Sequence, residues 1–373
     1  FHGSREVGSH LAVLTPSSAM EVGKGAFCYL LLALACWLKG CSVSDTPSSP
    51  DTVGDQGERR RGSFLVIGDW GWDANAHGNL KSKHCQQLVA DVMHEQMELL
   101  GDVKFIVNVG DSFYPDGVHN KSDPQWDEKW RQVYSPLVRS VPWYSVYGNH
   151  DLHADPCACS EDPASCAQVN ADINNLDFFY MPDTSFHQEL PELDTEVIVL
   201  DTNYLMWVNQ TCPHTPCPEQ CSENMKRRAF QAFELFQERV ARSTAPNWVV
   251  FSHYPTDYFP GAWNTSEPLQ WWTPSWVRMG ASEYPSGFPE FLTAMSNASR
   301  SSITYFGGHR HNVDQRTVYN TTPQTNWLSG GGGGWSTDGD EQGFVVGEIM
   351  EGGKVRTSAI IVNITDCLQE MVV

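Results

Sequence analysis

Short apolar runs, each bounded by glycine or polar residues, recur along the chain between residues 64 and 362. Runs of about four to eight apolar residues with such boundaries are typical of buried β-strands. On this basis the sequence predicts strands at Phe64–Ile67, Phe105–Val109, Trp143–Tyr147, Val197–Leu200, Trp248–Phe251, Ile303–Phe306, Phe344–Ile349 and Val355–Val362.

Two longer segments carry apolar residues three and four positions apart, which is the period of a helix with one buried face. They predict helices over about Asn79–Leu100, where Gly101 provides a stop, and over about Asn224–Arg242. Strands that alternate with helices favour an α/β fold. The final strands, Phe344–Ile349 and Val355–Val362, have no helix between them, and they suggest a second sheet packed against the first.

The first residues predict a segment that is removed from the mature protein. Met20 and Lys24 precede the mostly apolar stretch Ala26–Leu38, which is too short to span a bilayer. A secretory signal peptide has these features, and a signal anchor that stays in the membrane is the alternative. The expected organisation is a pre-sequence and signal peptide over residues 1–42, a flexible leader over 43–62, one folded domain over 63–365 and a C-terminal tail over 366–373.

Most cysteines lie beyond the apolar stretch and in two clusters, at residues 157–166 and 212–221. Clusters of this kind among polar residues predict disulfide-bonded loops and an oxidising compartment. A zinc site is the alternative, and it would use Cys212, His214, Cys217 and Cys221. Acceptor sites for N-glycosylation support the same compartment, and they stand at Asn120, Asn209, Asn264, Asn297, Asn320 and Asn363. The sequence therefore predicts a glycoprotein in a secreted, vacuolar or lysosomal location.

The net charge of the chain limits the kinds of partner that it can bind. The chain has 24 basic and 45 acidic residues, which gives a formal net charge of −21. Such a negative protein repels nucleic acid and anionic lipid unless it carries a separate basic patch, and the longest basic run is Arg59–Arg61. We therefore expect no nucleic-acid partner, and no membrane partner once the signal peptide is removed.

Candidate chemistry lies where the predicted strands end. Five of them are followed by short polar groups: Gly68-Asp69-Trp70-Gly71, Gly110-Asp111-Ser112-Phe113-Tyr114, Gly148-Asn149-His150-Asp151, Ser252-His253-Tyr254-Pro255 and Gly308-His309-Arg310-His311. The carboxyl ends of strands in an open α/β sheet share one edge, so these loops are expected to meet in one crevice. Their oxygen and nitrogen donors suffice for two metal ions, and they are Asp69, Asp111, Tyr114, Asn149, His253, His309 and His311.

This set of donors, in this order, resembles the metallophosphoesterase superfamily and, within it, the small purple acid phosphatases of the mammalian tartrate-resistant type. Tyr114 is the most specific element of the resemblance, and Val141–Tyr144 and Leu328–Gly330 support it. The resemblance implies a four-layer α/β/β/α sandwich with two central mixed sheets. It also implies an acid phosphatase that hydrolyses phosphate monoesters, either small molecules or phosphoproteins, by attack of a metal-bound hydroxide.

The resemblance further implies a role for each donor. Asp69, Asp111, Tyr114 and His311 would hold a ferric ion, and Asp111 would bridge to a divalent iron, zinc or manganese ion held by Asn149, His253 and His309. A tyrosine has a pKa of about 10, so it ligates as phenolate at acid pH only where a highly charged cation displaces its proton. Together the two ions would make the pocket locally cationic in spite of the negative protein.

His150 and Asp151 complete the expected catalytic residues. By the same resemblance His150 would contact the phosphate and protonate the leaving alkoxide, with Asp151 holding its ring. A purely positioning role for His150 is the alternative.

Three features depart from the family pattern. Ser252 replaces the usual glycine before the metal-binding histidine, and Arg310 stands where an acidic residue is common. The third is an absence, because no histidine occurs in the stretch Asp257–Trp263, where small members have one. The group that protonates the leaving alkoxide is therefore the least defined part of the expected mechanism.

Two glycine- or tryptophan-rich segments add further expectations. Gly330–Gly334 lack the lysine and helix of a phosphate-binding P-loop, so they predict close backbone approach beside the metals. The tryptophans within Phe259–Pro289 indicate either a substrate rim or packed loop aromatics. Two other functions stay open, a non-catalytic secreted or surface scaffold that retains the fold and a related metal-dependent phosphodiesterase or nucleotidase.

Overall fold

The computed structural model of the protein describes residues 59–71, 84–154, 166–205, 212–259, 302–315, 325–334, 341–352 and 354–363, together with residues 295, 323 and 367. The expected signal peptide, most of the expected leader and the tryptophan-rich segment after Phe259 lie outside the described residues. Among the helices of the described part, none is both long and apolar enough to cross a membrane.

Two mixed β-sheets form the centre of the fold. The first has the strand order β11-β10-β1-β2-β3, and its strands are β1 (Arg60–Ile67), β2 (Val103–Asn108), β3 (Trp143–Ser145), β10 (Gln342–Met350) and β11 (Lys354–Val362). The second has the order β4-β5-β6-β7-β9-β8, and its strands are β4 (Phe186–Leu190), β5 (Thr195–Val199), β6 (Asn247–Phe251), β7 (Ser302–Gly307), β8 (Val313–Asp314) and β9 (Thr325–Ser329). The inner strands β1–β3 are parallel to one another, as are β5, β6, β7 and β9.

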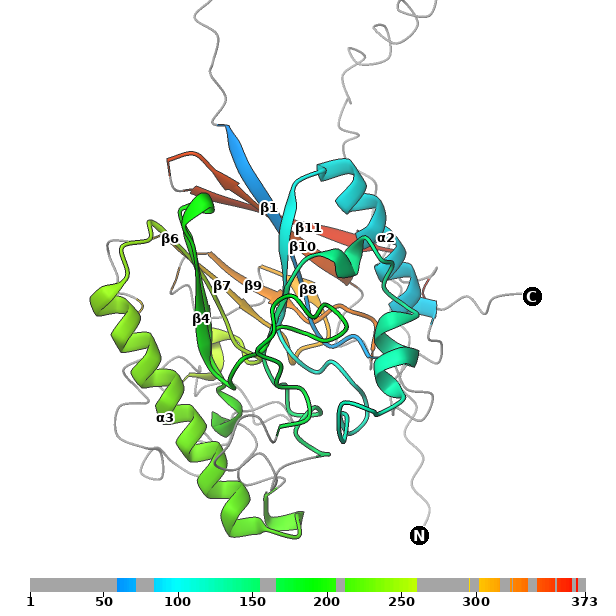
Figure 1. Ribbon diagram of the computed structural model, residues 1–373, viewed down its shortest axis with the longest axis vertical. Coiled ribbons are helices and arrows are strands. Elements are labelled where there is room, and N and C mark those ends of the chain that lie inside the picture. Colours follow the sequence, from blue (N-terminus) through cyan, green and yellow to red (C-terminus); the bar gives the residue numbers. More distant parts are fainter. Residues whose placement is uncertain are drawn as a thin grey trace, which may run out of the picture. The chain divides into compact units, whose positions relative to one another are not determined.

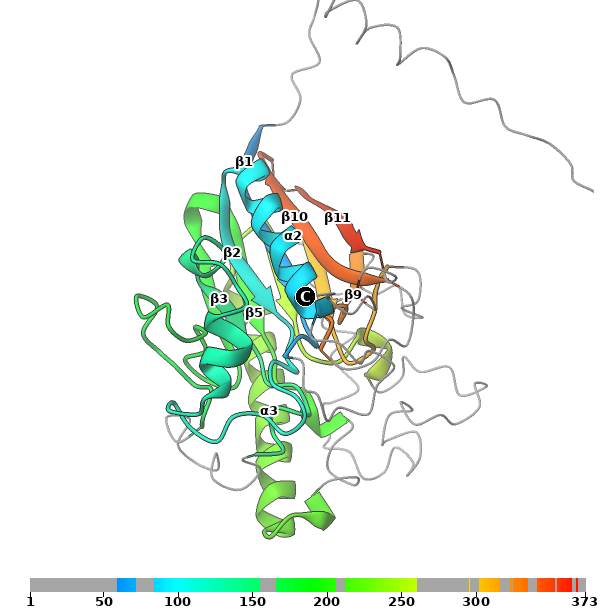
Figure 2. The same ribbon diagram turned by 90° about the vertical axis from the view of Figure 1, so that its right-hand side faces the viewer.

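Helices cover the outer faces of the two sheets. The helix α2 (His84–Leu100) packs on the first sheet, and α3 (Pro218–Arg242) packs on the second, so the helices lie on opposite sides of the pair of sheets (Figure 1). Turned by 90°, the view shows α2 running along β1 and β10 (Figure 2). The remaining helical segments are short: η1 (Trp126–Arg131), η2 (Val138–Ser140), η4 (Pro191–Leu193), η5 (Asn203–Leu205), η6 (Cys212–His214) and η7 (Thr256–Tyr258).

The central strands, such as β1 from Phe64 onward and β6, are apolar because both of their faces are buried. In β1, Phe64 and Val66 face the core between the sheets, whereas Leu65 and Ile67 pack with α2. In β6 the same alternation sends Val249 and Phe251 inward and Trp248 and Val250 toward α3. These clusters make the layers α/β/β/α, which confirms the predicted fold class.

The predicted assignment of the last two strands to the second sheet was wrong. Both β10 and β11 belong to the first sheet, where β10 pairs antiparallel with β1 from Arg60–Met350 to Val66–Val345. Partner choice between two sheets depends on contacts distant in sequence, which a local apolar pattern does not encode.

Some element bounds also differ from the prediction. The strand β1 begins at Arg60, because the side chain of Arg60 forms ion pairs with Asp102 at 2.8 Å and Glu348 at 2.8 Å that hold this end extended. The helix α3 begins at Pro218, six positions before the predicted Asn224, because proline suits the first turn of a helix. The strands β4, β8 and β9 were not predicted, since they are short or largely polar.

Disulfides close two parts of the described chain. Cys85 in α2 is bonded to Cys367, and Cys212 is bonded to Cys221. Cys166 and Cys217 are disulfide-bonded as well. The predicted disulfides are therefore confirmed, and the alternative zinc site is excluded because three of its four ligands are oxidised. Cys157 and Cys159 lie outside the described residues.

Candidate metal centre

The loops that carry the predicted donors come from both sheets. Those with Asp69, Asp111 and Asn149 follow β1, β2 and β3 of the first sheet, whereas those with His253 and His309 follow β6 and β7 of the second. The expectation of a single shared sheet edge is corrected in this respect. The loops still meet, because the two sheets face each other and the carboxyl ends of these strands lie at one end.

Backbone geometry at these strand ends is unusual. Three of the candidate donors have positive φ angles, namely Asp69 at 56°, Asp111 at 51° and His309 at 68°. Residues other than glycine rarely adopt positive φ angles. Where they do, surrounding contacts hold the backbone in this conformation, often at functional sites. The Asp69 amide donates to the Gly110 carbonyl at 2.9 Å, and the Trp70 amide donates to the Asp111 carbonyl at 3.1 Å. Neighbouring loops thus hold each other in the strained conformation.

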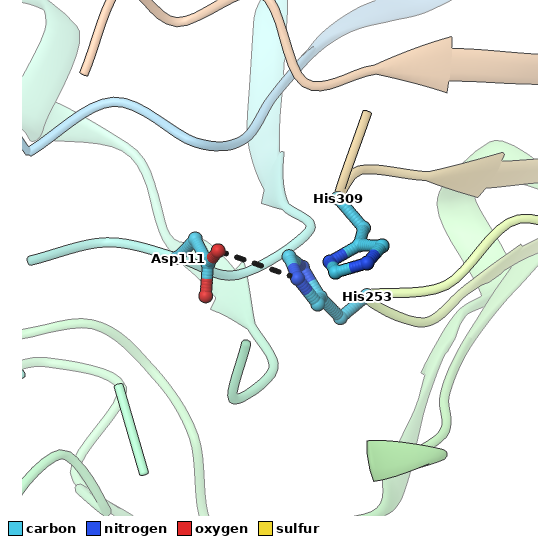
Figure 3. A group of neighbouring side chains, drawn as sticks. All are labelled: Asp111, His253 and His309. Atoms are coloured by element: carbon cyan, nitrogen blue, oxygen red, sulfur yellow. Dashed lines mark ion pairs between the residues drawn. The ribbon is translucent and has the colours of Figure 1, made fainter. Parts of the chain in front are cut away.

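One group of donors gathers around Asn149. Its Oδ1 lies 3.0 Å from His253 Nε2 and 2.9 Å from His309 Nδ1. His253 Nε2 also lies 3.5 Å from Asp111 Oδ2. Figure 3 shows the carboxylate of Asp111 and the rings of His253 and His309 turned toward one another from separate loops. The other ring nitrogen of His253, Nδ1, donates to the Val109 carbonyl at 2.9 Å, and this contact directs Nε2 to the centre.

A second group of donors shares Asp111 with the first. The Tyr114 hydroxyl lies 3.1 Å from Asp69 Oδ1 and 3.2 Å from Asp111 Oδ2. His311 Nε2 lies 3.6 Å from Asp69 Oδ1. Ligand atoms of Asp69, Asp111 and His311 are all within 4.8 Å of one another, and so are those of Asp111, His253 and His309. All seven predicted donors therefore meet, in two groups that have Asp111 in common.

The buried groups create an electrostatic environment that suits cations. Burial raises the pKa of Asp69 well above its usual range, and the charge of Asp111 raises it further. Burial and the same two carboxylates raise the pKa of Tyr114. Although burial opposes it, the charge of Asp111 raises the pKa of His253 to about 9. Acidic groups crowded in this way are stabilised by bound positive charge, so the donor set fits metal ions in its chemistry as well as its spacing.

A comparison with known families agrees with this geometry. Residues 62–315, more than half of the chain, match the family model described as calcineurin-like phosphoesterase. The chain belongs to this family. The matched range contains every candidate donor, from Asp69 to His311.

Individual relatives of this phosphoesterase match shorter stretches of the chain. The chain is 34% identical over 134 residues to purple acid phosphatase 3 of Arabidopsis thaliana, and the match covers 33% of this chain and 34% of the relative. It is 34% identical over 91 residues to tartrate-resistant acid phosphatase type 5 of Rattus norvegicus, covering 24% of this chain and 26% of the relative. The chain thus spans about a third or less of these relatives, and the resemblance to purple acid phosphatases is confirmed.

Among solved structures, the phosphoesterase is similar to one titled "GAP50 the anchor in the inner membrane complex of Plasmodium". The sequence identity is 18% and the TM-score 0.48, over 80% of this chain and 84% of that chain.

His150 lies beside the centre of the phosphoesterase and contacts it through its backbone. Its amide donates to Asp111 Oδ1 at 2.8 Å, and its ring Nδ1 donates to the Pro115 carbonyl at 2.6 Å. Its ring centroid is 4.6 Å from that of Tyr114. Burial lowers the pKa of His150 from its usual value, against the charge of Asp111.

Asp151 occupies a different place from the one predicted. Its carboxylate accepts the backbone amides of Ser112 at 2.9 Å, Phe113 at 3.2 Å and Gly148 at 2.9 Å. It also accepts from Gln168 at 2.9 Å. Asp151 therefore ties the loop after β2 to the loop after β3, whereas the Pro115 carbonyl holds the His150 ring. The expected contact between Asp151 and that ring was wrong, because the nearby amide donors occupy the carboxylate.

An Asp151→Asn substitution is expected to destabilise the fold by about 1–3 kcal/mol, because an amide group accepts fewer of these hydrogen bonds and leaves buried backbone donors unsatisfied. Thermal or urea unfolding measures the change. Asp116→Asn is a matched control, since Asp116 is 64% exposed and pairs only with His153 among the described contacts. Equal stability of Asp151→Asn and the wild type would contradict the tying role.

The backbone of Gly330–Gly334 passes close to the donors, as the sequence predicted for a glycine run that is not a P-loop. A Cβ atom on Gly334 would lie 2.7 Å from the Asp69 carbonyl oxygen and 2.8 Å from Tyr114 Cε2. A Cβ atom on Gly330 would lie 2.7 Å from Asp69 Oδ2. The backbone here passes so close to the donors that only glycine fits.

Sequence reasoning did not find the groups that support the donors. Lys129, which is buried, donates through Nζ to the Tyr114 carbonyl and at 2.8 Å to Gln125. The unusual Ser252 donates at 2.9 Å to the Tyr254 carbonyl and lies 2.6 Å from the Tyr305 hydroxyl. These contacts involve backbone carbonyls and distant loops, so no sequence motif marks them.

Proposed function

We propose that the protein is an acid phosphatase with a dinuclear metal centre, and that it hydrolyses phosphate monoesters. The sharing of Asp111 by two groups of buried donors is the observation that carries the proposal. Membership in the calcineurin-like phosphoesterase family and the partial match to purple acid phosphatases support it.

In this proposal the donors divide between two ions. Asp69, Asp111, Tyr114 and His311 hold a ferric ion. Asp111, Asn149, His253 and His309 hold a divalent iron, zinc or manganese ion. Such a pair of ions supplies Lewis-acid activation of water and phosphate, and the ferric charge keeps this chemistry available at acid pH.

The pocket around the ions would bind the phosphate and supply a proton to the leaving group. Two such ions would carry more positive charge than Asp69, Asp111 and Tyr114 remove, so with them bound the pocket would attract a phosphate anion even though the protein is negative. His150 lies next to Asn149 in the same loop, and its Nδ1 bond to Pro115 fixes the ring so that Nε2 can meet the phosphate. There, in the imidazolium form that acid pH favours, it orients the ester oxygen and delivers the proton of Nε2 to the leaving alkoxide.

We also propose the cellular setting. Disulfides in the described part of the chain support an oxidising compartment, either secreted or vacuolar and lysosomal. This setting fits a signal peptide over residues 1–42, a leader that ends near residue 62 and a phosphoesterase domain over 63–365. Substrates in this setting are small phosphate esters or phosphoproteins.

The test is an assay of the full chain, purified from an oxidising eukaryotic host, on an aryl phosphate between pH 4 and pH 8. The proposal expects hydrolysis that is strongest on the acid side, and expects a chelator to abolish it. A matched aryl phosphodiester serves as the comparison substrate. Folded protein that cleaves neither ester would support a scaffold instead, and faster cleavage of the diester would support a phosphodiesterase.

A further inference from the structure

An ion pair joins the two loops that bring histidines from the second sheet. Arg310, between His309 and His311, pairs through Nη2 with the Asp257 carboxylate of η7. The Asp257 side chain is 0% exposed and that of Arg310 is 12% exposed. Arg310 stands where an acidic residue is common in the family, and Asp257 begins the stretch that lacks the family's histidine.

Aromatic rings connect this ion pair to His309. The Arg310 guanidinium carbon lies 5.4 Å from the centroid of the Tyr258 ring. The same ring meets the His309 ring edge-on, with centroids 5.4 Å apart and planes at 89°. Tyr254 packs on His309 from a centroid distance of 4.7 Å. His309 is thus held in place by two rings of the segment that also carries His253.

The segment that receives Arg310 is itself fixed. Thr256, at the start of η7, donates to Asn326 of β9 at 3.1 Å. The Tyr258 amide donates to the Pro255 carbonyl at 3.0 Å. A guanidinium docked on this turn therefore cannot shift without breaking a buried ion pair, and breaking such a pair by removing one partner leaves a costly unpaired charge.

We propose that the Arg310–Asp257 ion pair locks the His309–His311 loop onto η7, and that Arg310 is a positioning residue that holds His309 beside His253. The lock itself follows from contacts between described side chains. Its consequence for metal binding rests on the proposed function, and it concerns the divalent half of the centre.

Substitutions at Asp257 and Arg310 that change the charge or the donor geometry have different expected effects. In Asp257→Asn the guanidinium stays cationic but loses its counter-charge beside a metal site. The His309–His311 loop should therefore be held less firmly, and the affinity for a divalent ion should fall. Arg310→Lys keeps the positive charge but loses the planar fork of donors. This variant should therefore retain part of the ion pair and show a smaller effect than Asp257→Asn. Glu196→Gln is the matched control, because Glu196 forms a buried ion pair with Arg239, with side chains 0% and 8% exposed, near the opposite end of the second sheet.

The experiment uses the full chain in two measurements. The first is hydrogen exchange of the amides of residues 308–312 in metal-free protein. We expect exchange about tenfold faster in Asp257→Asn, an intermediate rate in Arg310→Lys, and a wild-type rate in Glu196→Gln. The second is binding of Co²⁺, followed by its visible spectrum. We expect about tenfold weaker binding and an altered spectrum in Asp257→Asn, a smaller loss of affinity in Arg310→Lys, and wild-type binding in Glu196→Gln.

The outcomes separate the proposal from the proposed function. Unchanged exchange in Asp257→Asn overturns the lock, and so does equal acceleration in Glu196→Gln, which would reflect general destabilisation. Faster exchange with unchanged Co²⁺ affinity overturns the positioning of His309. If the wild type binds no Co²⁺ while exchange behaves as expected, the lock stands and the proposed function fails.

Discussion

The Asp111→Asn protein is expected to lose both metal ions and at least about a thousandfold of its phosphatase activity. Asp111 is the one side chain shared by the two donor groups, and its carboxylate lies near both Tyr114 and His253. Asparagine keeps the size but removes the negative charge that two ions would share. Metal content per chain and kcat on an aryl phosphate measure the effect, with circular dichroism to establish that the variant folds.

A matched control for this substitution is Asp102→Asn. Asp102 is a partly buried carboxylate that pairs with Arg60 at 2.8 Å, at the far end of β1 from the metal loops. This control should keep both ions and full activity. Two tightly bound ions and a full rate in Asp111→Asn would show that the bridging assignment is wrong.

The Tyr114→Phe protein is expected to become colourless while it retains weak hydrolysis. Burial and the carboxylates of Asp69 and Asp111 raise the pKa of the Tyr114 phenol, so only a strongly charged ion converts it to the phenolate that gives charge-transfer absorption. Phenylalanine removes the ligand but leaves Asp69, Asp111 and His311 to hold the ion more weakly. Visible absorption of the purified protein, together with its iron content, measures the loss.

Tyr134→Phe is the control for colour. Tyr134 is buried in the aromatic cluster against Trp70, Trp130 and Trp143, and it belongs to neither donor group. It should leave the absorption band unchanged. If Tyr114→Phe keeps the full band at unchanged iron content, another residue is the source of the colour and the ferric assignment of Tyr114 fails.

Much of the fold could be predicted because its central strands are buried on both faces. Runs such as Phe64–Ile67 and Trp248–Phe251 are apolar throughout, and turn glycines mark their ends. The edge strand β4 was missed because its exposed positions are polar. The sheet to which β10 belongs was also missed, because its pairing with β1 joins residues nearly three hundred positions apart.

The donors of the candidate site were predictable for a related reason. Each lies in the loop that follows a strand, two to six residues beyond the strand end, so the position of the strand places the ligand approximately, as for Asp111 after β2 and His309 after β7. The supporting contacts were not predictable. Asp151 binds three backbone amides, and Arg310 finds Asp257 in another loop, and neither partner is indicated by spacing or composition.

The most direct test of the central claim is anomalous diffraction from crystals of the metal-loaded protein, recorded at the iron and zinc absorption edges. We expect two peaks, each about 2.0–2.4 Å from an oxygen of Asp111, with Tyr114 bound to the iron peak and His253 to the other. A single peak, or two ions of which only one touches Asp111, would contradict the account.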